Sequence, residues 1–190
     1  SSYTTYVAMG DGECNEGSTY EAFVSAVQFG LDKLVVFIDH NGYQQDGTTK
    51  EILNIPFVNM LNAIGCHTVE IDGNDVDAID AAISKAKKSN DKPTMIMIHT
   101  VIGFGSAKQG TNKVHGSPLG DEDGANAKAF YGYKGEPFVV PNEVYNHFKA
   151  TFAKRGEEAH KAYEKAVAEW KASHAGAAKK FENAVSGDTT

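Results

Sequence analysis

Short apolar runs alternate, in the first half of the chain, with stretches in which apolar side chains recur at helical spacing. Residues 3–9 are β-branched and aromatic and run into Gly10-Asp11-Gly12, which predicts a strand followed by a turn. Residues 34–38 (LVVFI) form a continuous apolar run, typical of a parallel strand buried on both faces, and residues 39–42 form the next turn. Between the two strands, residues 16–30 have the spacing of an amphipathic helix, with apolar positions at Tyr20, Phe23, Val24, Val27 and Leu31.

The same alternation continues as far as residue 99. We expect helices at 56–64 and 76–88 and strands at 67–71 and 94–99. Strands that alternate with helices predict an α/β fold with a parallel sheet. Since the connections in such sheets are right-handed, helices should cover both faces.

The rest of the chain has a different pattern. From residue 100 to about 141 it is rich in Gly, Asn, Asp and Lys and has little periodicity, which predicts a long loop that is functional or disordered. Residues 142–185 are rich in Ala, Lys and Glu and predict two or three amphipathic helices, interrupted at Gly156 and Gly176. One helical stripe there contains Tyr163, Val167, Trp170 and His174.

We therefore expect two parts, an α/β domain at 1–141 and a helical extension or linker at 142–190. The first strand begins almost at the first residue. For this reason we expect the α/β domain to be incomplete at its N-terminus and the chain to be a piece of a longer protein.

Composition narrows the classes of partner. The 190 residues are 41% hydrophobic and 23% charged, which is ordinary for a globular domain. The net charge of −7 would repel nucleic acids and anionic membranes, so we expect neither as a partner. No stretch approaches the roughly 18 apolar residues of a membrane span and no signal peptide opens the chain, which predicts a cytoplasmic protein. Cys14 and Cys66 lack any ligand spacing and should be buried, reduced thiols.

Polar side chains follow two of the expected strands where each strand ends. Asp11 follows the strand at 3–9, and Asn41 follows the strand at 34–38, about thirty residues later. One strand–helix–strand unit has this length, so both side chains should reach the edge where open α/β sheets bind ligands. Mg²⁺ prefers hard oxygen ligands and combines one or two protein oxygens with phosphates and water. The spacing therefore predicts a magnesium-diphosphate site.

Gly12 leaves room for a phosphate beside Asp11, and we expect amides at the start of the following helix to donate to that anion. A purely structural explanation is also open: Asp11 caps the helix and Asn41-Gly42 makes a turn. The two explanations are compatible.

Longer segments carry a more specific pattern. GDG followed after about thirty residues by Asn resembles the fingerprint of thiamine-diphosphate enzymes. The order and spacing of three segments are similar to those of transketolases: GDGECNEGSTYEAF, FIDHNGYQQDG and TVIGFGSAKQGTNKVHGSPLGD. The resemblance covers most of the chain and weakens in the C-terminal helices. It implies the diphosphate-binding α/β domain of that family, as a fragment or a split subunit.

The resemblance implies a metal site. Mg²⁺, for which Ca²⁺ can substitute, would be bound by the side chains of Asp11 and Asn41 and by the main-chain carbonyl of Tyr43. Three positions depart from the common pattern of the family. It usually has an aliphatic residue where Tyr43 stands, often Asp where His40 stands, and often an aliphatic residue where Gln45 stands.

The resemblance also assigns cofactor contacts and a catalytic residue. The N–H of Gly12 would donate to the diphosphate of thiamine diphosphate, Asn41 would lie at the cofactor, and Ile102 would contact its ring system. His115 would lie near the diphosphate and the reacting sugar. As a group that titrates near neutrality, it would stabilise or transfer charge on the donor oxygen.

Partners follow from the same resemblance. Transketolases move a two-carbon ketol unit from a ketose phosphate to an aldose phosphate, with the cofactor between this domain and the pyrimidine-binding domain of a second subunit. Glu16 and Glu21 match glutamates near the two-fold axis of the homodimer. Nothing in this chain matches a pyrimidine domain, its activating glutamate or a basic cluster for a sugar phosphate. We therefore expect the isolated chain to be inactive and to bind the cofactor weakly.

Two alternatives remain open. The chain could belong to a related thiamine enzyme, such as a dihydroxyacetone synthase. It could also be a non-catalytic scaffold that keeps the sheet and the interface without the chemistry, although the presence of Asp11, Asn41 and His115 argues against this.

Overall fold

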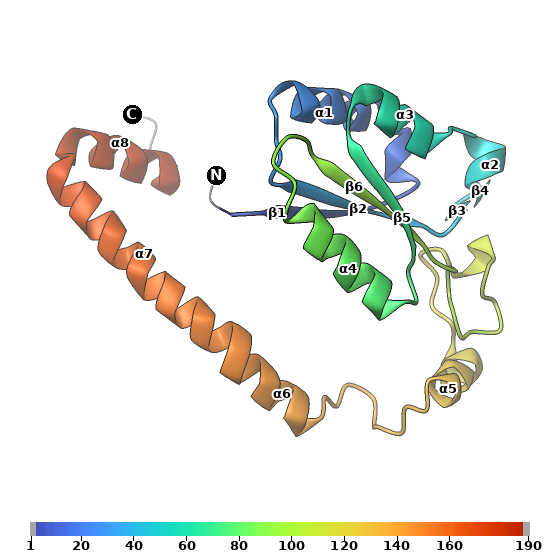
Figure 1. Ribbon diagram of the computed structural model, residues 1–190. Helices are drawn as coiled ribbons and strands as arrows, with labels where there is room; N and C mark the ends of the chain where they lie inside the picture. Colours follow the sequence, from blue (N-terminus) through green and yellow to red (C-terminus); the bar gives the residue numbers. More distant parts are fainter. Residues whose placement is uncertain (1–2, 188–190) are drawn as a thin grey trace. The chain divides into compact units, whose positions relative to one another are not determined.

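A parallel sheet with the strand order β1-β2-β6-β5 forms the centre of the first part of the molecule (Figure 1). The computed structural model describes residues 3–187, and the chain divides into a unit that ends at Lys134 and a unit that begins at Gly135. The predicted α/β fold with a parallel sheet is confirmed. The strands are β1 (Thr5–Gly10), β2 (Leu34–His40), β5 (His67–Asp72) and β6 (Thr94–His99).

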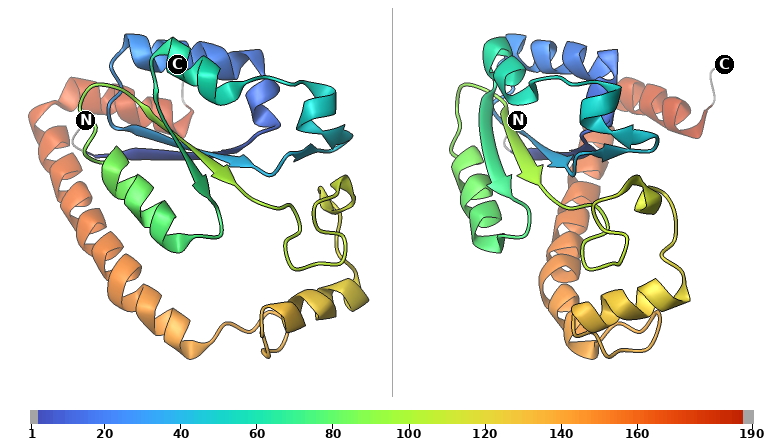
Figure 2. Two further views of the ribbon diagram at one scale, coloured as in Figure 1. Left: turned by 45° about the vertical axis from the view of Figure 1, so that its right-hand side comes forward. Right: turned by 90° about the vertical axis from the view of Figure 1, so that its right-hand side faces the viewer.

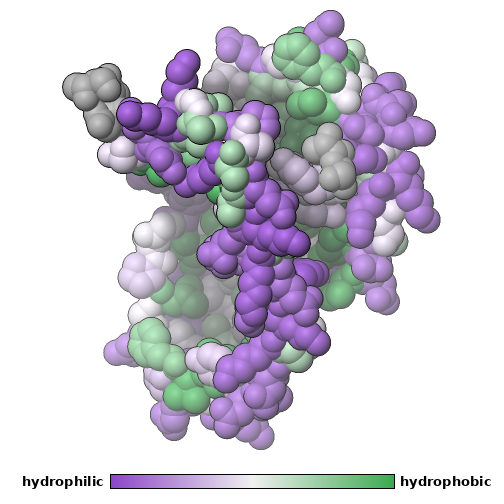
Figure 3. Space-filling view, turned by 90° about the vertical axis from the view of Figure 1, so that its left-hand side faces the viewer, coloured by the Kyte–Doolittle hydropathy of each residue, from purple (hydrophilic) through white to green (hydrophobic). Residues whose placement is uncertain are grey.

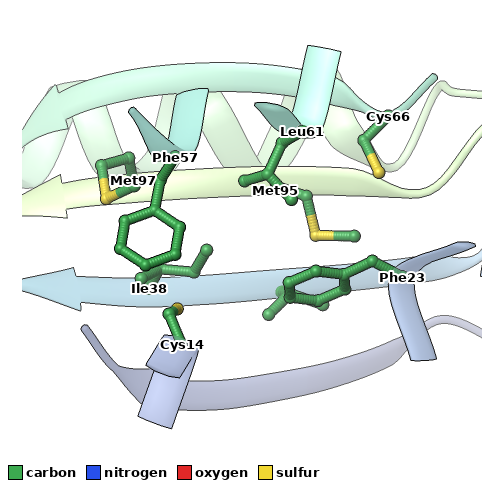
Figure 4. Packing of buried hydrophobic residues seen from close by; sticks show 9 residues of the cluster. Cys14, Phe23, Ile38, Phe57, Leu61, Cys66, Met95 and Met97 are labelled. Carbon is green, nitrogen blue, oxygen red and sulfur yellow. The ribbon is translucent and has the colours of Figure 1, made fainter. Parts of the chain in front are cut away.

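Helices cover both faces of this sheet, as predicted (Figure 2). On one face α1 (Gly17–Gln28) and α3 (Phe57–Ile64) pack against the strands, and on the other α4 (Val76–Ala86) does so. Figure 4 shows the larger cluster, in which side chains from α1 and α3 are directed at β2 and β6. Its buried members are Cys14, Phe23, Val36, Ile38, Phe57, Leu61, Cys66, Met95 and Met97. The prediction of two buried, reduced cysteines is also confirmed.

Local sequence signals set the ends of these helices. Asp75 begins α4 by accepting a hydrogen bond from the N–H of Ala78 at 3.0 Å. Gly65 ends α3 in the left-handed region at φ 110°, where a glycine is preferred. Between β2 and α3 lie the short hairpin of β3 (Tyr43–Gln44) and β4 (Gly47–Thr48) and the single turn α2 (Thr49–Ile52), which begins with a capping box.

The register of the parallel strands decides which residues meet at the ends of the sheet. Gly10 pairs with Asp39, and His40 pairs with His99. We call this end, where the strands finish, the carboxyl edge, and the opposite end, which contains His67, the amino edge. Because β1 and β2 finish side by side, Asp11 and Asn41 emerge next to each other, as their spacing predicted.

The prediction of a loop without regular structure from residue 100 to about 141 is wrong in part. It contains a 3₁₀ turn at Asn112–Val114 and the helix α5 (Asp121–Phe130). Tertiary contacts rather than an apolar stripe hold α5. Its buried Asp123 accepts a hydrogen bond from the N–H of Ala107 at 2.7 Å, and the ring of Phe130 packs edge-on against Phe104.

The second unit is helical, as predicted, and consists of α6 (Asn142–Phe148), a π-helical stretch (Lys149–Ala153), α7 (Lys154–Ser173) and α8 (Ala175–Ser186). Hydrophilic side chains dominate the face of α7 seen in Figure 3. The expected interruptions at Gly156 and Gly176 are wrong, since both glycines lie inside helices and the break falls at His174. There Trp170 stacks on His174 and meets Phe181 edge-on, which stabilises the turn between the two helices.

The division at Lys134 precedes the expected domain boundary at 141 by a short segment without helix or strand, and that boundary stays a prediction. Within residues 3–187, no helix combines the length and the apolar character that crossing a membrane requires.

Candidate metal and cofactor site

A cavity of about 320 Å³ opens at the carboxyl edge of the sheet. Three segments that are distant in the sequence supply its walls: the turn after β1, the hairpin after β2 and the loop after β6. Its lining residues are Gly10, Asp11, Gly12, Glu13, Asn41, Tyr43, Gln44, Gln45 and His115. The fold thus brings together residues that the sequence pattern had selected separately.

Asp11 is a buried carboxylate with one oxygen held by the protein. Its side chain is 2% exposed, and Oδ2 accepts a hydrogen bond from the N–H of Gly42 at 2.9 Å. Oδ2 also lies 3.1 Å from Nδ1 of His40. Among the described residues, Oδ1 of Asp11 receives no hydrogen bond. A carboxylate oxygen that receives no protein donor and belongs to a side chain lining the cavity is available as a cation ligand.

The carboxylate of Asp11 changes the pKa of the His40 ring. The contact with Asp11 raises the pKa of His40 above its ordinary value, while partial burial of the ring acts in the opposite direction. The Nδ1 atom is buried and lies 3.1 Å from Oδ2 of Asp11, which is within hydrogen-bond distance, although within residues 3–187 it makes no well-aligned hydrogen bond.

Asn41 and Tyr43 form a turn in which the main-chain carbonyl of Tyr43 takes no part in the hairpin ladder. Oδ1 of Asn41 accepts a hydrogen bond from the N–H of Tyr43 at 3.0 Å, which leaves a second lone pair on that oxygen. The N–H of Thr49 donates to the carbonyl of Gly42 at 3.0 Å. Because hydrogen-bonded pairs alternate along an antiparallel hairpin, Tyr43 falls at the intervening position. Its carbonyl is therefore outside the ladder.

The expectation that Asp11 caps the next helix is wrong, because its side chain crosses to Gly42 instead. The turn predicted at Asn41-Gly42 is present. The expected amide donors at the start of the helix also change. A 3₁₀ turn at Glu13–Asn15 precedes α1, and the N–H groups of Cys14, Asn15 and Glu16 bond back to carbonyls within the turn.

Two main-chain N–H groups at this turn have no acceptor among the described residues, those of Gly12 and Glu13. Both residues line the cavity. A Cβ added to Gly12 would come within 3.4 Å of Cγ of Gln44 and would occupy space beside these donors. Adjacent free N–H groups in a turn form a concavity suited to an anion such as a phosphate.

His115 reaches the cavity because its loop is tightly packed. Gly103 has φ +65°, and a Cβ there would come within 2.8 Å of Val114, so only a glycine allows this close approach. The side-chain amide of Asn112 donates to the carbonyl of Gln45 at 3.4 Å, which links the loop to the hairpin after β2. These contacts hold the exposed His115 opposite Asp11 and Asn41.

Comparison with known proteins identifies the family. The family model described as the thiamine diphosphate binding domain of transketolase matches residues 1–190. This chain belongs to the transketolase family. A probable transketolase of Streptococcus pneumoniae serotype 4 is 44% identical over 185 residues, which are 96% of this chain and 28% of that protein. Transketolase 2 of Escherichia coli K12 is 39% identical over 96% of this chain and 27% of its own length.

Solved transketolases have the same fold. The enzyme from Leishmania mexicana superposes with a TM-score of 0.80 at 37% identity and covers 95% of this chain. A Pichia stipitis transketolase in complex with sedoheptulose 7-phosphate superposes with a TM-score of 0.79 at 33% identity. This chain covers 27% of each of those two, so it spans little more than a quarter of the transketolases that it matches.

The remaining site residues expected from the transketolase resemblance lie outside the cavity lining. Ile102 is half-buried in the loop after β6, where its carbonyl accepts a hydrogen bond from Gly110 at 2.8 Å. Glu16 and Glu21 are exposed, one directly before α1 and one within it. Their roles at the cofactor ring and at a subunit interface stay predictions.

Within residues 3–187, no three side chains of His, Cys, Asp or Glu gather as a metal site. A cation at the carboxyl edge therefore has to draw on amide, main-chain and ligand oxygens in addition to carboxylate. The residues present fit this requirement, since Asp11 offers a carboxylate oxygen, Asn41 an amide oxygen and Tyr43 a carbonyl. Mg²⁺ is commonly held by so few protein ligands when a diphosphate supplies others.

Sequence reasoning did not assign a role to the contact between His40 and Asp11. From the sequence, His40 is only a departure from the family pattern. The contact follows from the pairing of Gly10 on β1 with Asp39 on β2. This pairing places the next residue of each strand, Asp11 and His40, side by side. The position of His40 in β2 decides on which face of the sheet its side chain lies, but only the register reveals its neighbour.

Proposed function

We propose that the cavity at the carboxyl edge binds Mg²⁺ and the diphosphate of thiamine diphosphate, and that the chain serves as this domain in a transketolase. Such an enzyme transfers a two-carbon ketol unit from a ketose phosphate to an aldose phosphate. The convergence of Asp11, Gly12, Asn41, Tyr43 and His115 on one cavity supports this proposal most strongly.

The residues that would hold the metal supply different kinds of oxygen. The free Oδ1 of Asp11 neutralises part of the charge of the cation, while Asn41 and the carbonyl of Tyr43 add neutral oxygens. The N–H groups of Gly12 and Glu13 donate to diphosphate oxygens. Ca²⁺ can replace Mg²⁺ because both take oxygen ligands, although Ca²⁺ prefers longer bonds and a larger number of ligands.

His115 is the catalytic residue in this proposal. When bound, thiamine diphosphate supplies the carbon centre that carries the two-carbon unit. The imidazole of His115 stabilises or transfers charge on the oxygen of the donor sugar. Its exposed position on the cavity wall lets a substrate reach it.

A homodimer completes the site in this account. The pyrimidine-binding domain of a second subunit holds the other end of the cofactor, and Glu16 and Glu21 lie near the interface between subunits. Ile102 contacts the ring system of the cofactor. Sugar phosphates are the substrates, in keeping with the sedoheptulose 7-phosphate bound by the Pichia stipitis relative. We place this activity in the cytoplasm.

A comparison of the isolated chain with an assembled one tests the proposal. The 190-residue chain should show no ketol transfer and only weak, Mg²⁺-dependent binding of thiamine diphosphate by calorimetry. Adding a transketolase pyrimidine-binding domain should strengthen binding and restore turnover. Clear turnover by the isolated chain would contradict the proposal that a second subunit completes the site. Binding of thiamine diphosphate that does not depend on Mg²⁺ would contradict the metal site.

A further inference from the structure

We infer that His40 is a positioning residue that orients the carboxylate of Asp11 toward the metal, a role that rests on the proposed function. In the part of the chain that the structure describes, two polar groups contact Oδ2 of Asp11, the N–H of Gly42 at 2.9 Å and Nδ1 of His40 at 3.1 Å. Holding one oxygen turns the other toward the cavity that contains Asn41. Of the two groups, only His40 can be changed by substitution without altering the main chain.

The carboxylate that His40 contacts is buried. Asp11 is 2% exposed, so its orientation depends on protein groups rather than on water. Asp11 lines the candidate site, whereas His40 lines two other cavities, on the side of α3 and α2. His40 therefore contacts the carboxylate of Asp11 from the side away from the candidate site and does not itself bind the metal. Outer-shell partners of this kind fix the geometry of ligating carboxylates.

His40 is itself held in place by a second histidine. The rings of His40 and His99 meet edge-on, with centroids 5.3 Å apart. Nε2 of His99 lies 2.9 Å from Oε2 of Glu70, which fixes the orientation of the His99 ring. A continuous series of contacts thus runs from Glu70 on β5, through two histidines on β6 and β2, to the carboxylate of Asp11.

The measurement is the binding of Mn²⁺ by the full chain in the presence of saturating thiamine diphosphate, followed by the loss of the spectroscopic signal of free aqueous Mn²⁺. We expect His40→Phe, which keeps a ring but no donor, to weaken Mn²⁺ binding about tenfold. His40→Asn places an amide nitrogen at the position of Nδ1 and should restore binding to within about twofold of the wild type.

The amino edge supplies a matched control. His67 and Asp91 form a second histidine–carboxylate pair at 2.9 Å, with a side-chain exposure close to that of His99 and Glu70. His67→Phe should leave Mn²⁺ binding unchanged. If His40→Phe fails to fold, as judged by its thermal midpoint, His40→Leu replaces it in the same comparison.

The outcomes separate this inference from the proposed function. Wild-type affinity in a folded His40→Phe or His40→Leu variant overturns the inference and leaves the proposed function intact. Equal weakening by His40→Asn and His40→Phe overturns it too, because a donor at that position would then have no role. A wild-type chain that binds no Mn²⁺ with the cofactor overturns the proposed function, and the role of His40 with it.

Discussion

The two ends of the sheet each carry a histidine–carboxylate pair, His67–Asp91 at the amino edge and His99–Glu70 at the carboxyl edge, and both pairs lie at 2.9 Å. Each end also has a cavity, and the one at the amino edge is the larger, about 500 Å³ against about 320 Å³. Neither the ion pairs nor the cavity volumes therefore separate a ligand site from an ordinary surface.

The groups left without partners do separate the two ends. At the carboxyl edge, Asp11 is buried, and within residues 3–187 one of its oxygens receives no donor and the N–H groups of Gly12 and Glu13 have no acceptor. At the amino edge, Asp91 is exposed and is already engaged by His67 and Ser89. A buried, half-satisfied carboxylate beside free main-chain donors is what a metal diphosphate requires. The carboxylate of Asp91 is solvated by water, and an exposed ion pair of this kind contributes little to stability.

The largest effect is expected from removing the carboxylate at the carboxyl edge. Asp11→Ala should weaken Mg²⁺-dependent binding of thiamine diphosphate by more than about a hundredfold, beyond the loss typical of outer-shell partners. The matched change at the amino edge, Asp91→Ala, should leave binding unchanged. Calorimetric titration of both variants checks this, and equal binding by both would remove the distinction between the two ends.

Much of this contrast could be predicted from the sequence. The apolar run of β2 ends at a glycine-containing turn, and the length of one strand–helix–strand unit was enough to place Asp11 beside Asn41. The helix α5 could not be predicted, because Gly124 and acidic residues give it no apolar stripe and its support comes from distant contacts such as Phe104 with Phe130.

The finer parts of the site depend on geometry that residue types do not encode. A 3₁₀ turn before α1 leaves the amides of Gly12 and Glu13 without acceptors among the described residues. The resemblance implied the amide of Gly12, but the residue pattern suggested the first turn of the helix rather than Glu13. The contact between His40 and Asp11 depends on the pairing register of β1 and β2, which many side chains set together.

A smaller effect, confined to catalysis, is expected at His115. His115→Asn, assayed in a complex of the chain with a transketolase pyrimidine-binding domain, should lower turnover about a hundredfold, because a group that stabilises charge is lost. Cofactor affinity should change only a few-fold. His67→Asn at the amino edge should keep wild-type turnover. A His115→Asn enzyme with normal turnover would show that the histidine only lines the cavity.

The smallest effect on function is expected at the cysteines, one near each edge. Burial first, then the charges of Asp11 and Glu13, raises the pKa of Cys14 from 9.0 to about 12. Burial also raises the pKa of Cys66, partly offset by Lys92. Only the thiolate reacts with disulfide reagents, and a raised pKa keeps the thiol protonated at pH 8.

Both thiols should therefore stay unmodified in the folded chain at pH 8, with cofactor binding unaffected, and both should react once guanidinium unfolds it. A colorimetric thiol titration checks this. Rapid modification of Cys14 in the folded chain would mean that the core beneath the carboxyl edge is open to solvent.

The most direct test of the central claim is an anomalous difference map from crystals of the chain grown with Mn²⁺ and thiamine diphosphate. The account predicts a Mn²⁺ peak about 2 Å from Oδ1 of Asp11, the side-chain oxygen of Asn41 and the carbonyl of Tyr43. A peak beside Asp91 at the amino edge, or one that touches none of these three oxygens, would contradict it.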